Sequence, residues 1–446
     1  MPNTPTRPIT GHDIEHLRLT LEPVTGDLKD VDVAMLLNVA PNRLRQILKA
    51  GMAKGEDPAE VIPPPTGILV RLLQRHPNYT PLVSKPQPME VFETIKIMLP
   101  TLQRVAPGKS PHDNRMAFGP VFGRSSIVGY KLLESEEQSV SGTLIRLMTL
   151  VMCCLADQAR KTILEQLDGD SKHEHRLHFL GHTPWDWRLL LELDKALADY
   201  IPIPSREKVK GLIEERQAQW WSETYLQVVK DEAASRNLDV ERTLKQGKWT
   251  NRETVTDADL REYPTNTRPI LGGTTALIGE RLRTQFTLTN AEYHWVQGVA
   301  PVVLFRQRKE KASQRVDATT AILLRYLSRH PKDLGLLIPP SMTGDELSEW
   351  IATELDPEFR NINLGPLLGG SVSRGYRFLR EPEPPRWTRR LTTIIQQQRT
   401  HNPGVYDDIK QAMREEAVAR GLDPEKVWND GIWSPESNTQ SGEGDQ

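Results

Sequence analysis

"FGPVFGRSSIVGYKLLE" (Phe118–Glu134) and "LGPLLGGSVSRGYRFLR" (Leu364–Arg380) are two versions of one pattern, since seven of their seventeen positions agree without a gap. Each version places a glycine-proline pair, a second glycine and a serine ahead of a glycine-tyrosine pair. This pattern is unusual for a core helix, because a glycine inside a helix costs about 1 kcal/mol relative to alanine. It predicts a specialised helical unit that the chain contains twice.

The repetition extends over most of the chain. Four further pairs occur in the same order, which favours a duplicated chain over chance matches. The closing pair lies closer together in the sequence than the others, so the first half carries an insertion, placed at about Ala156–Gln217. The four pairs are "TRPI" (Thr6–Ile9, Thr267–Ile270), "VAP" (Val39–Pro41, Val299–Pro301), the "RHP" stretches (Ile68–Pro77, Ile322–Pro331) and the closing motifs (Asp231–Trp249, Glu415–Trp433).

Length and periodicity set the expected organisation. A chain of 446 residues predicts about three folding units at roughly 150 residues each. Helical periodicity dominates, as in Met89–Val105 and Tyr406–Gly421, and alternating β-branched runs are nearly absent, so the expected fold is mainly α. The expected segments are 1–138 (first-half helix-turn-helix region), 139–255 (insertion and first closing motif), 256–382 (second-half helix-turn-helix region), 383–433 (second closing motif) and 434–446 (disordered tail).

Composition excludes several classes of protein. Charged residues are 26% and apolar residues 37% of the chain, which is typical of a folded protein. The apolar stretch Leu144–Ala156 is interrupted by Arg146 and is too short to span a bilayer, and the first residues lack an export signal, so we expect a cytoplasmic protein without a membrane partner. The neighbours Cys153 and Cys154 are expected to be small buried side chains rather than disulfide or zinc ligands.

A two-helix pattern is visible in "VAMLLNVAPNRLRQIL" (residues 33–48). Two helices that cross steeply need a small residue at the contact, a corner residue that tolerates positive φ and an apolar residue after the corner. Ala34, Asn38 and Val39 supply these in order, and Pro41 is expected to begin the second helix. Its outward positions are Asn42, Arg43, Arg45, Gln46 and Lys49, with no acidic residue among them.

The opening stretches fit the same template with changes. Gly119 takes the position of the small residue, Gly123 forms the corner, Ser125 caps the second helix, and Leu132 and Leu133 are the apolar residues after it. In contrast, Arg124 stands at an apolar position. Gly129 and its twin Gly375 lie inside the expected second helix, which indicates a close backbone approach to either a neighbouring helix or a phosphate strand.

These motifs resemble the helix-turn-helix superfamily of DNA-binding regulators, over about twenty residues at each of four places. The resemblance implies that the second helix of each motif enters the major groove. It places Arg43, Arg45 and Gln46 against bases or phosphates in the first motif, and Ser373, Arg374 and Arg377 in the last. The two others match less well: residues 293–309 carry His294 and Gln307 at positions that are usually small and apolar, and the first opening stretch presents Ser126, Ile127 and Val128 to the groove.

Local basic runs agree with this interpretation, although the net charge is −2. Arg43–Gly55 and Phe305–Arg315 are strongly positive, as a phosphate-binding face would be; the alternative is a solvated helix face. The expected DNA-binding residues are Asn42, Arg43, Arg45, Gln46, Lys49, Arg124, Ser126, Lys131, Arg306, Arg308, Ser373, Arg374 and Arg377.

Other residues are given structural roles. The histidines of the insertion have ligand chemistry but no standard metal spacing, so we expect neither metal nor cofactor. The two "RHP" motifs are expected to end helices. Tryptophans of the insertion and closing motifs are expected to be core anchors rather than platforms for stacked bases. The residues concerned are His173, His175, His178, His182, Trp185, Trp187, Trp220, Trp221, Trp249 and Trp433.

No phosphate-binding glycine loop, nucleophile elbow or catalytic carboxylate pair is present in the sequence, so an enzyme is not expected. The favoured function is a sequence-specific double-stranded DNA-binding transcriptional regulator, whose two halves act as a pseudo-dimer within one chain. The duplicated arrangement resembles regulators of bacterial mobile elements. Further partners would be the transcription machinery or another regulator. The alternative is a non-catalytic helical adaptor in a nucleoprotein or DNA-transfer assembly.

Overall fold

The computed structural model is helical throughout the part that it describes. Within these residues there is no strand, and a single antiparallel bridge joins Leu271 to Arg315. The expectation of a mainly α fold is confirmed. The described residues are 7–25, 28, 30–37, 39, 41–49, 62–77, 79, 118–134, 141–167, 187–190, 193–249, 261, 264–286, 288, 290–299, 301–338, 341–381, 384–385, 388–399 and 402–433.

The chain divides into two compact units that do not coincide with the sequence halves. Unit 1 comprises Met1–Ser84 and Ser341–Gln446, and unit 2 comprises Lys85–Pro340. Unit 1 therefore joins the start of the first half to the end of the second. Unit 2 joins the end of the first half to the start of the second. The units divide the chain after Ser84 and Pro340, whereas the segments expected from the sequence end at residues 138, 255, 382 and 433.

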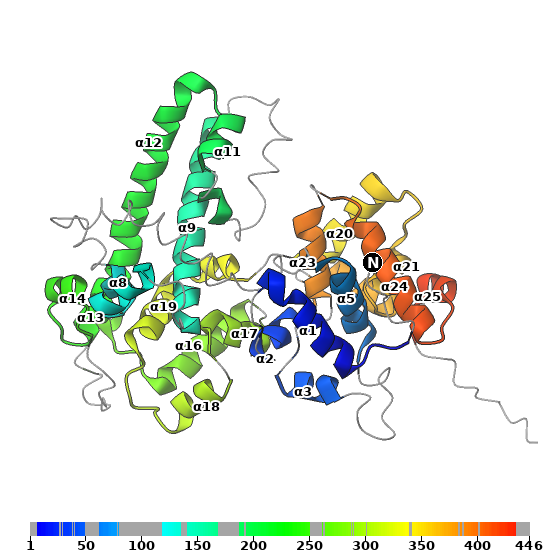
Figure 1. Cartoon of the computed structure of the whole chain (residues 1–446), viewed down its shortest axis with the longest axis horizontal. Helices are drawn as coiled ribbons and strands as arrows, with labels where there is room; N and C mark the ends of the chain where they lie inside the picture. The colour runs from blue at the N-terminus through cyan, green and yellow to red at the C-terminus, as the bar shows by residue number, and fades with distance from the viewer. Residues whose placement is uncertain are drawn as a thin grey trace, which may run out of the picture. The chain divides into compact units, whose positions relative to one another are not determined.

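Unit 1 is built from short helices around one apolar core, which includes Leu17, Leu72, Leu364, Phe378 and Ile409. Figure 1 shows its helices in blue and in yellow to red, because they come from the two ends of the chain. Its elements are α1 (Gly11–Thr25), α2 (Asp30–Leu36), α3 (Pro41–Lys49), α5 (Pro64–Arg75), α20 (Gly344–Trp350), the π-helical turn η7 (Ile351–Leu355), α21 (Asn361–Leu367), α22 (Val372–Arg380), α23 (Arg389–Gln398), α24 (Val405–Ala419) and α25 (Pro424–Asp430).

Unit 2 contains the counterparts of these helices and a long hairpin formed by α9 and α12 (Figure 1). The hairpin has its own apolar cluster, which includes Ile163, Leu197 and Ile213. The elements are α8 (Ser126–Glu134), α9 (Gly142–Leu167), η3 (Trp187–Leu190), α11 (Leu193–Tyr200), α12 (Ile203–Gln219), the π-helical turn η4 (Trp220–Tyr225), α13 (Leu226–Ser235), α14 (Val240–Gln246), η5 (Thr265–Thr267), α16 (Gly272–Gln285), α17 (Asn290–Gln297), α18 (Pro301–Lys309), α19 (Ala318–Arg329) and η6 (Pro331–Leu336).

A buried ion network joins the two chain segments of unit 1. Arg71 on α5 donates from Nε to Oε2 of Glu416 on α24 at 2.7 Å, and both side chains are 0% exposed. Arg420 reaches Oε1 of the same carboxylate at 2.7 Å, and Arg71 also donates to the carbonyl of Arg7. Since Arg71 and Glu416 come from different halves, this network joins segments of both halves within unit 1.

Unit 2 repeats the network at equivalent positions of the duplication. Arg325 on α19 and Arg236 on α13 both contact Glu232, each at 2.7 Å. Arg325 also donates to the carbonyl of Arg268, as Arg71 does to that of Arg7. The early segment of one half is thus paired with the late segment of the other half in both units.

The helix α9 corrects one expectation from the sequence. It has 26 residues, and by length and composition it could cross a membrane; 78% of its most apolar window is buried inside the protein. The stretch Leu144–Ala156 was expected to be interrupted by Arg146 and too short to span a bilayer, whereas the helix runs through Arg146 from Gly142 to Leu167. Arg146 lies in the protein interior. Cys153 and Cys154 are buried thiols, as expected.

Helix ends follow the sequence closely. The helices α5 and α19 end at Arg75 and Arg329, and His76 and His330 are their C-caps, so the "RHP" prediction is confirmed. Trp221 is 1% exposed and packs with Phe122 and Tyr225, as a core anchor does. Some expectations fall outside the described residues: the four histidines, Trp185, the side chain of Trp187, the helix at Met89–Val105 and the tail 434–446.

Candidate nucleic-acid interface

The corner between α2 and α3 is fixed from the inside. Ala34, Leu44 and Ile47 are at most 1% exposed, and the amide of Val39 donates to the carbonyl of Ala34 at 2.9 Å. Gly11, at the start of α1, lies so close to the end of α3 that a Cβ there would be 1.9 Å from the carbonyl oxygen of Leu48. The helix α3 is therefore held on one face and presents the other to solvent.

A buried arginine fastens the same corner. Arg390 on α23 is 2% exposed and donates from Nε to the carbonyl of Met35 at 3.0 Å. In unit 2, Arg146 on α9 donates to the carbonyl of Trp295 at 2.8 Å, and its guanidinium lies 3.5 Å from the centre of the Trp295 ring. The motifs "RLTTII" (Arg390–Ile395) and "RLMTLV" (Arg146–Val151) carry these arginines. This further repeat was missed in the sequence, although its arginine-leucine start could have revealed it.

The outward face of α3 is polar. Asn42, Arg45, Gln46 and Lys49 are exposed, while Arg43 is half-buried and donates to Oε1 of Gln46 at 3.0 Å. Within the described residues, neither Arg45 nor Lys49 has a carboxylate partner. The basic run continues to Gly55, but the residues after Lys49 lie outside the described part. All five residues expected from the sequence therefore lie on one short helix.

Glycine pairs build the second corner of each unit. A Cβ on Gly375 would lie 2.5 Å from the backbone nitrogen of Gly365, and a Cβ on Gly129 would lie 2.2 Å from that of Gly119. The corner glycines Gly369 and Gly123 have positive φ, +79° and +73°. The glycines inside the second helices are thus needed for contact with the neighbouring helix, which resolves the choice that the sequence left open.

The closing motifs support the same helix pairs. Gly431, with φ +65°, would place a Cβ 2.6 Å from the nitrogen of Val372 at the start of α22. Gly247, with φ +64°, takes the equivalent place at the start of α8. Ser371 caps α22 by accepting from the amide of Arg374 at 3.3 Å. The closing motif is therefore present twice because each copy packs against the start of the second helix in its unit.

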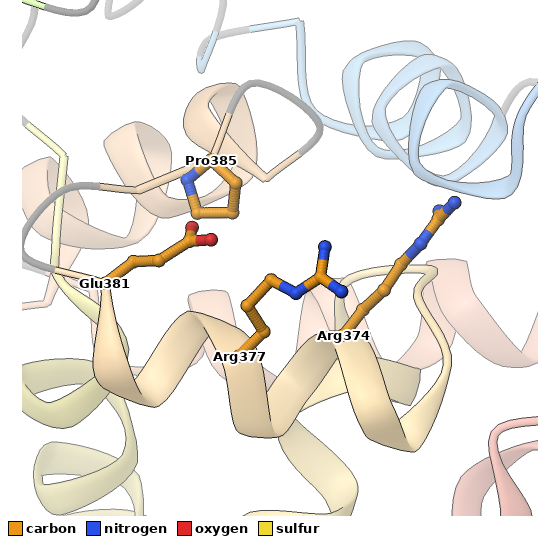
Figure 2. A pocket seen from close by; sticks show the side chains of 4 residues that line it. All are labelled: Arg374, Arg377, Glu381 and Pro385. Carbon is orange, nitrogen blue, oxygen red and sulfur yellow. The ribbon is translucent and has the colours of Figure 1, made fainter.

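The outward face of α22 is strongly basic. Ser373, Arg374, Arg377, Arg380 and Tyr376 are exposed, while Gly375 and Phe378 are buried against the core. Arg374 and Arg377 project from the same side of the helix into a cleft of about 340 Å³ that Glu381 and Pro385 complete (Figure 2). Arg377 and Glu381 stand in this cleft without forming an ion pair. The helix itself contains no acidic residue.

The equivalent helix α8 differs in surface chemistry. Ile127 is 63% and Val128 37% exposed, and Lys131 is exposed. Ser126, in contrast, is 4% exposed and donates to the carbonyl of Lys245 at 3.3 Å. Arg124 is half-buried and donates to Oγ of Ser141 at 2.7 Å. The burial of Ser126 contradicts its expected contact with DNA, whereas the expected contact of the half-buried Arg124 stays a prediction.

The remaining expected residues lie on α18 or outside the described part. Arg306 and Lys309 on α18 are exposed, together with Val302, Val303 and Phe305. The side chains of Arg308, Leu132 and Leu133 are not among those described. Among the described residues, no group of three or more His, Cys, Asp or Glu side chains could hold a metal ion.

Comparisons with known proteins identify no relative. No protein-family model matches the chain, no curated protein matches it, and no solved structure matches it.

Proposed function

We propose that this chain binds double-stranded DNA sequence-specifically and acts as a transcriptional regulator. The observation that carries the proposal is the exposed face of α22, which presents Arg374, Arg377 and Arg380 with no acidic residue in the helix. Arginine forms paired hydrogen bonds with guanine and with phosphate, so three arginines on one helix face suit a nucleic acid.

Two classes of arginine in the chain support this interpretation. Arg71, Arg325, Arg146 and Arg390 are buried and bonded to carboxylates or carbonyl oxygens of the protein, so the fold requires them. The arginines of α22 are exposed and pack against no core cluster. Their side chains therefore lie on the protein surface, which a polyanion can approach.

The helix α3 supplies a second polar face in unit 1. It follows a tight corner, as α22 does, and its nine residues extend over roughly 13 Å at 1.5 Å per residue. A helix of this kind fits the major groove, where Arg45 could bind guanine and Gln46 could bind adenine. Regulation of transcription is the role that we assign to this sequence-specific binding.

A non-catalytic adaptor is the second candidate, and the surface of α8 favours it. Ile127 and Val128 expose apolar side chains where α22 exposes Ser373 and Arg374. An exposed apolar pair suits contact with another protein more than contact with phosphate.

The test is selection of bound sequences from a random pool of double-stranded DNA, followed by affinity measurements on the enriched sequence at several salt concentrations. We expect one enriched motif and a log-log salt slope of about −0.9 per phosphate contacted. The double variant R374A/R377A should lose enrichment, whereas the control K195A/K208A, which removes one exposed charge from α11 and one from α12, should keep it. Absence of any enriched sequence would exclude the regulator and leave the adaptor.

A further inference from the structure

The helices α3 and α18 are held in the same way in their respective units. Each begins at a proline, Pro41 or Pro301, and buries one leucine, Leu44 or Leu304, to 1% and 2% exposure. A Cβ on Gly272 would lie 2.3 Å from the carbonyl oxygen of Gln307. In the same way, a Cβ on Gly11 would lie against the end of α3. The buried arginines Arg146 and Arg390 fasten equivalent corners. The two helices therefore present equivalent faces.

The chemistry of the α18 face is different. Val302, Val303 and Phe305 are 54%, 40% and 53% exposed, at the positions of Asn42, Arg43 and Arg45 in α3. Val302 and Phe305 are three residues apart and share one side of the helix. Large apolar side chains at such exposure indicate a surface that is covered when the protein acts.

Charge on the same helix indicates what covers it. Arg306 and Lys309 are exposed next to the apolar residues, and Lys309 Nζ lies 5.0 Å from the centre of the Phe305 ring. The helix Pro301–Lys309 contains no acidic residue. An apolar patch followed by cations matches the major groove at a thymine. The C5-methyl group of thymine is apolar and can contact the patch, and the phosphates beside the groove are negative and can bind the cations.

We infer that α18 reads thymine, with Val302 and Phe305 packed on C5-methyl groups and Arg306 and Lys309 bound to phosphates. The inference rests on the proposed function, which it sharpens: the DNA site has two unequal parts. One part contains guanine or adenine and is read by Arg45 and Gln46 of α3. The other contains thymine and is read by α18.

Replacement of thymine by deoxyuridine tests the inference at the level of one methyl group. The full chain is titrated, at one fixed salt concentration, with the selected DNA and with copies in which deoxyuridine replaces thymine in one part of the site at a time. We expect about fourfold weaker binding for each contacted methyl that is lost, and no change for the other part. The variant V302S/F305S should bind the thymine and the deoxyuridine DNA with equal affinity. The variant N42A/R45A should still bind the thymine DNA more tightly than the deoxyuridine DNA.

Each remaining outcome has a defined meaning. Specific binding that is indifferent to deoxyuridine in every part of the site would overturn the thymine contact and leave the proposed function standing. If V302S/F305S then also left affinity and base preference unchanged, α18 would be a surface for a protein partner. Failure to enrich any DNA would overturn both proposals. The variants alter exposed residues, and circular dichroism verifies that they fold.

Discussion

The helices α22 of unit 1 and α8 of unit 2 share one internal construction and have opposite surfaces. Both pack through a pair of glycine backbones and begin after a left-handed corner glycine. On the exposed side, Ser373 and Arg374 in α22 stand where α8 has Ile127 and Val128. The comparison shows that the repeated residues specify packing, while the residues between them are free to specify a partner.

The difference between α3 and α18 follows the same rule. Leu44 and Leu304 are buried alike, whereas Arg45 is matched by Phe305. Unit 1 thus presents polar and basic helix faces, and unit 2 presents more apolar ones. Helices with the same packing residues therefore carry two kinds of surface.

The largest expected effect concerns the buried networks that make the two units alike. Glu416→Gln leaves Arg71 and Arg420 buried without their carboxylate, so unit 1 should lose about 3–5 kcal/mol of unfolding free energy. Glu232→Gln should do the same to unit 2. Urea unfolding followed by circular dichroism checks this. The control Glu425→Gln breaks an exposed pair and should cost about 0–1 kcal/mol; an equal loss in all three variants would contradict the prediction.

Next in size is the glycine contact that shapes α22 and α8. Gly375→Ala and Gly129→Ala place a methyl group against backbone, so each should cost about 1–3 kcal/mol or more. Gly211→Ala, in the middle of α12 with nothing within 4 Å of the added Cβ, should instead stabilise by up to about 1 kcal/mol. The midpoint of thermal unfolding of the three variants tests this. If Gly129→Ala and Gly375→Ala were as stable as the original chain, the helices that carry these glycines would not contact the neighbouring helices.

The surface contrast is tested on DNA. Arg374→Ala should cost about 1–3 kcal/mol of binding free energy and relax the base preference in one part of the site only, if its guanidinium grips a guanine. Val128→Ala, at the same position of α8, should leave affinity unchanged. Footprinting both variants beside the original chain gives the answer. Uniform weakening over all sequences would show that Arg374 contacts phosphate alone, and no change would remove α22 from the interface.

The smallest effect is a difference in acid sensitivity between the units. Burial lowers the pKa of His330 in unit 2, so the neutral ring is favoured in the folded state and stability is lost as pH falls from about 6.5 through the lowered pKa. In unit 1, hydrogen bonds from Tyr406 and then Lys410 lower the pKa of Asp356 below 3.8, so its contribution is lost only in stronger acid.

Urea unfolding between pH 3 and pH 7 should therefore show unit 2 weakening before unit 1. His330→Gln should reduce the pH dependence of unfolding free energy in unit 2 and leave that of unit 1 unchanged. Asp356→Asn should reduce it in unit 1 and leave that of unit 2 unchanged. If the two units of the original chain lost unfolding free energy over the same pH range, His330 and Asp356 would not determine how stability depends on pH.

The sequence by itself determined the mainly α fold, the repeated motifs and several helix ends. Pro41 begins α3, the Ser125 hydroxyl accepts from the amide of Val128 at the start of α8, and Arg75 and Arg329 end their helices, because caps and prolines act through neighbouring backbone groups. Such local rules can be read without knowing the rest of the fold. The exposed residues of α3 and α22 could be placed in the same way, from helical spacing alone.

Only the tertiary structure decided which repeated segments pair. Arg71 bonds to Glu416, 345 residues away, although the sequence offers Glu232 at the equivalent position of its own half. Both choices satisfy the same hydrogen bonds, so residue types cannot select between them, and only the tertiary structure shows that the pairing crosses the halves. The burial of Ser126 and the contact of Gly129 with Gly119 were also set by packing, because each depends on a backbone brought close from another helix.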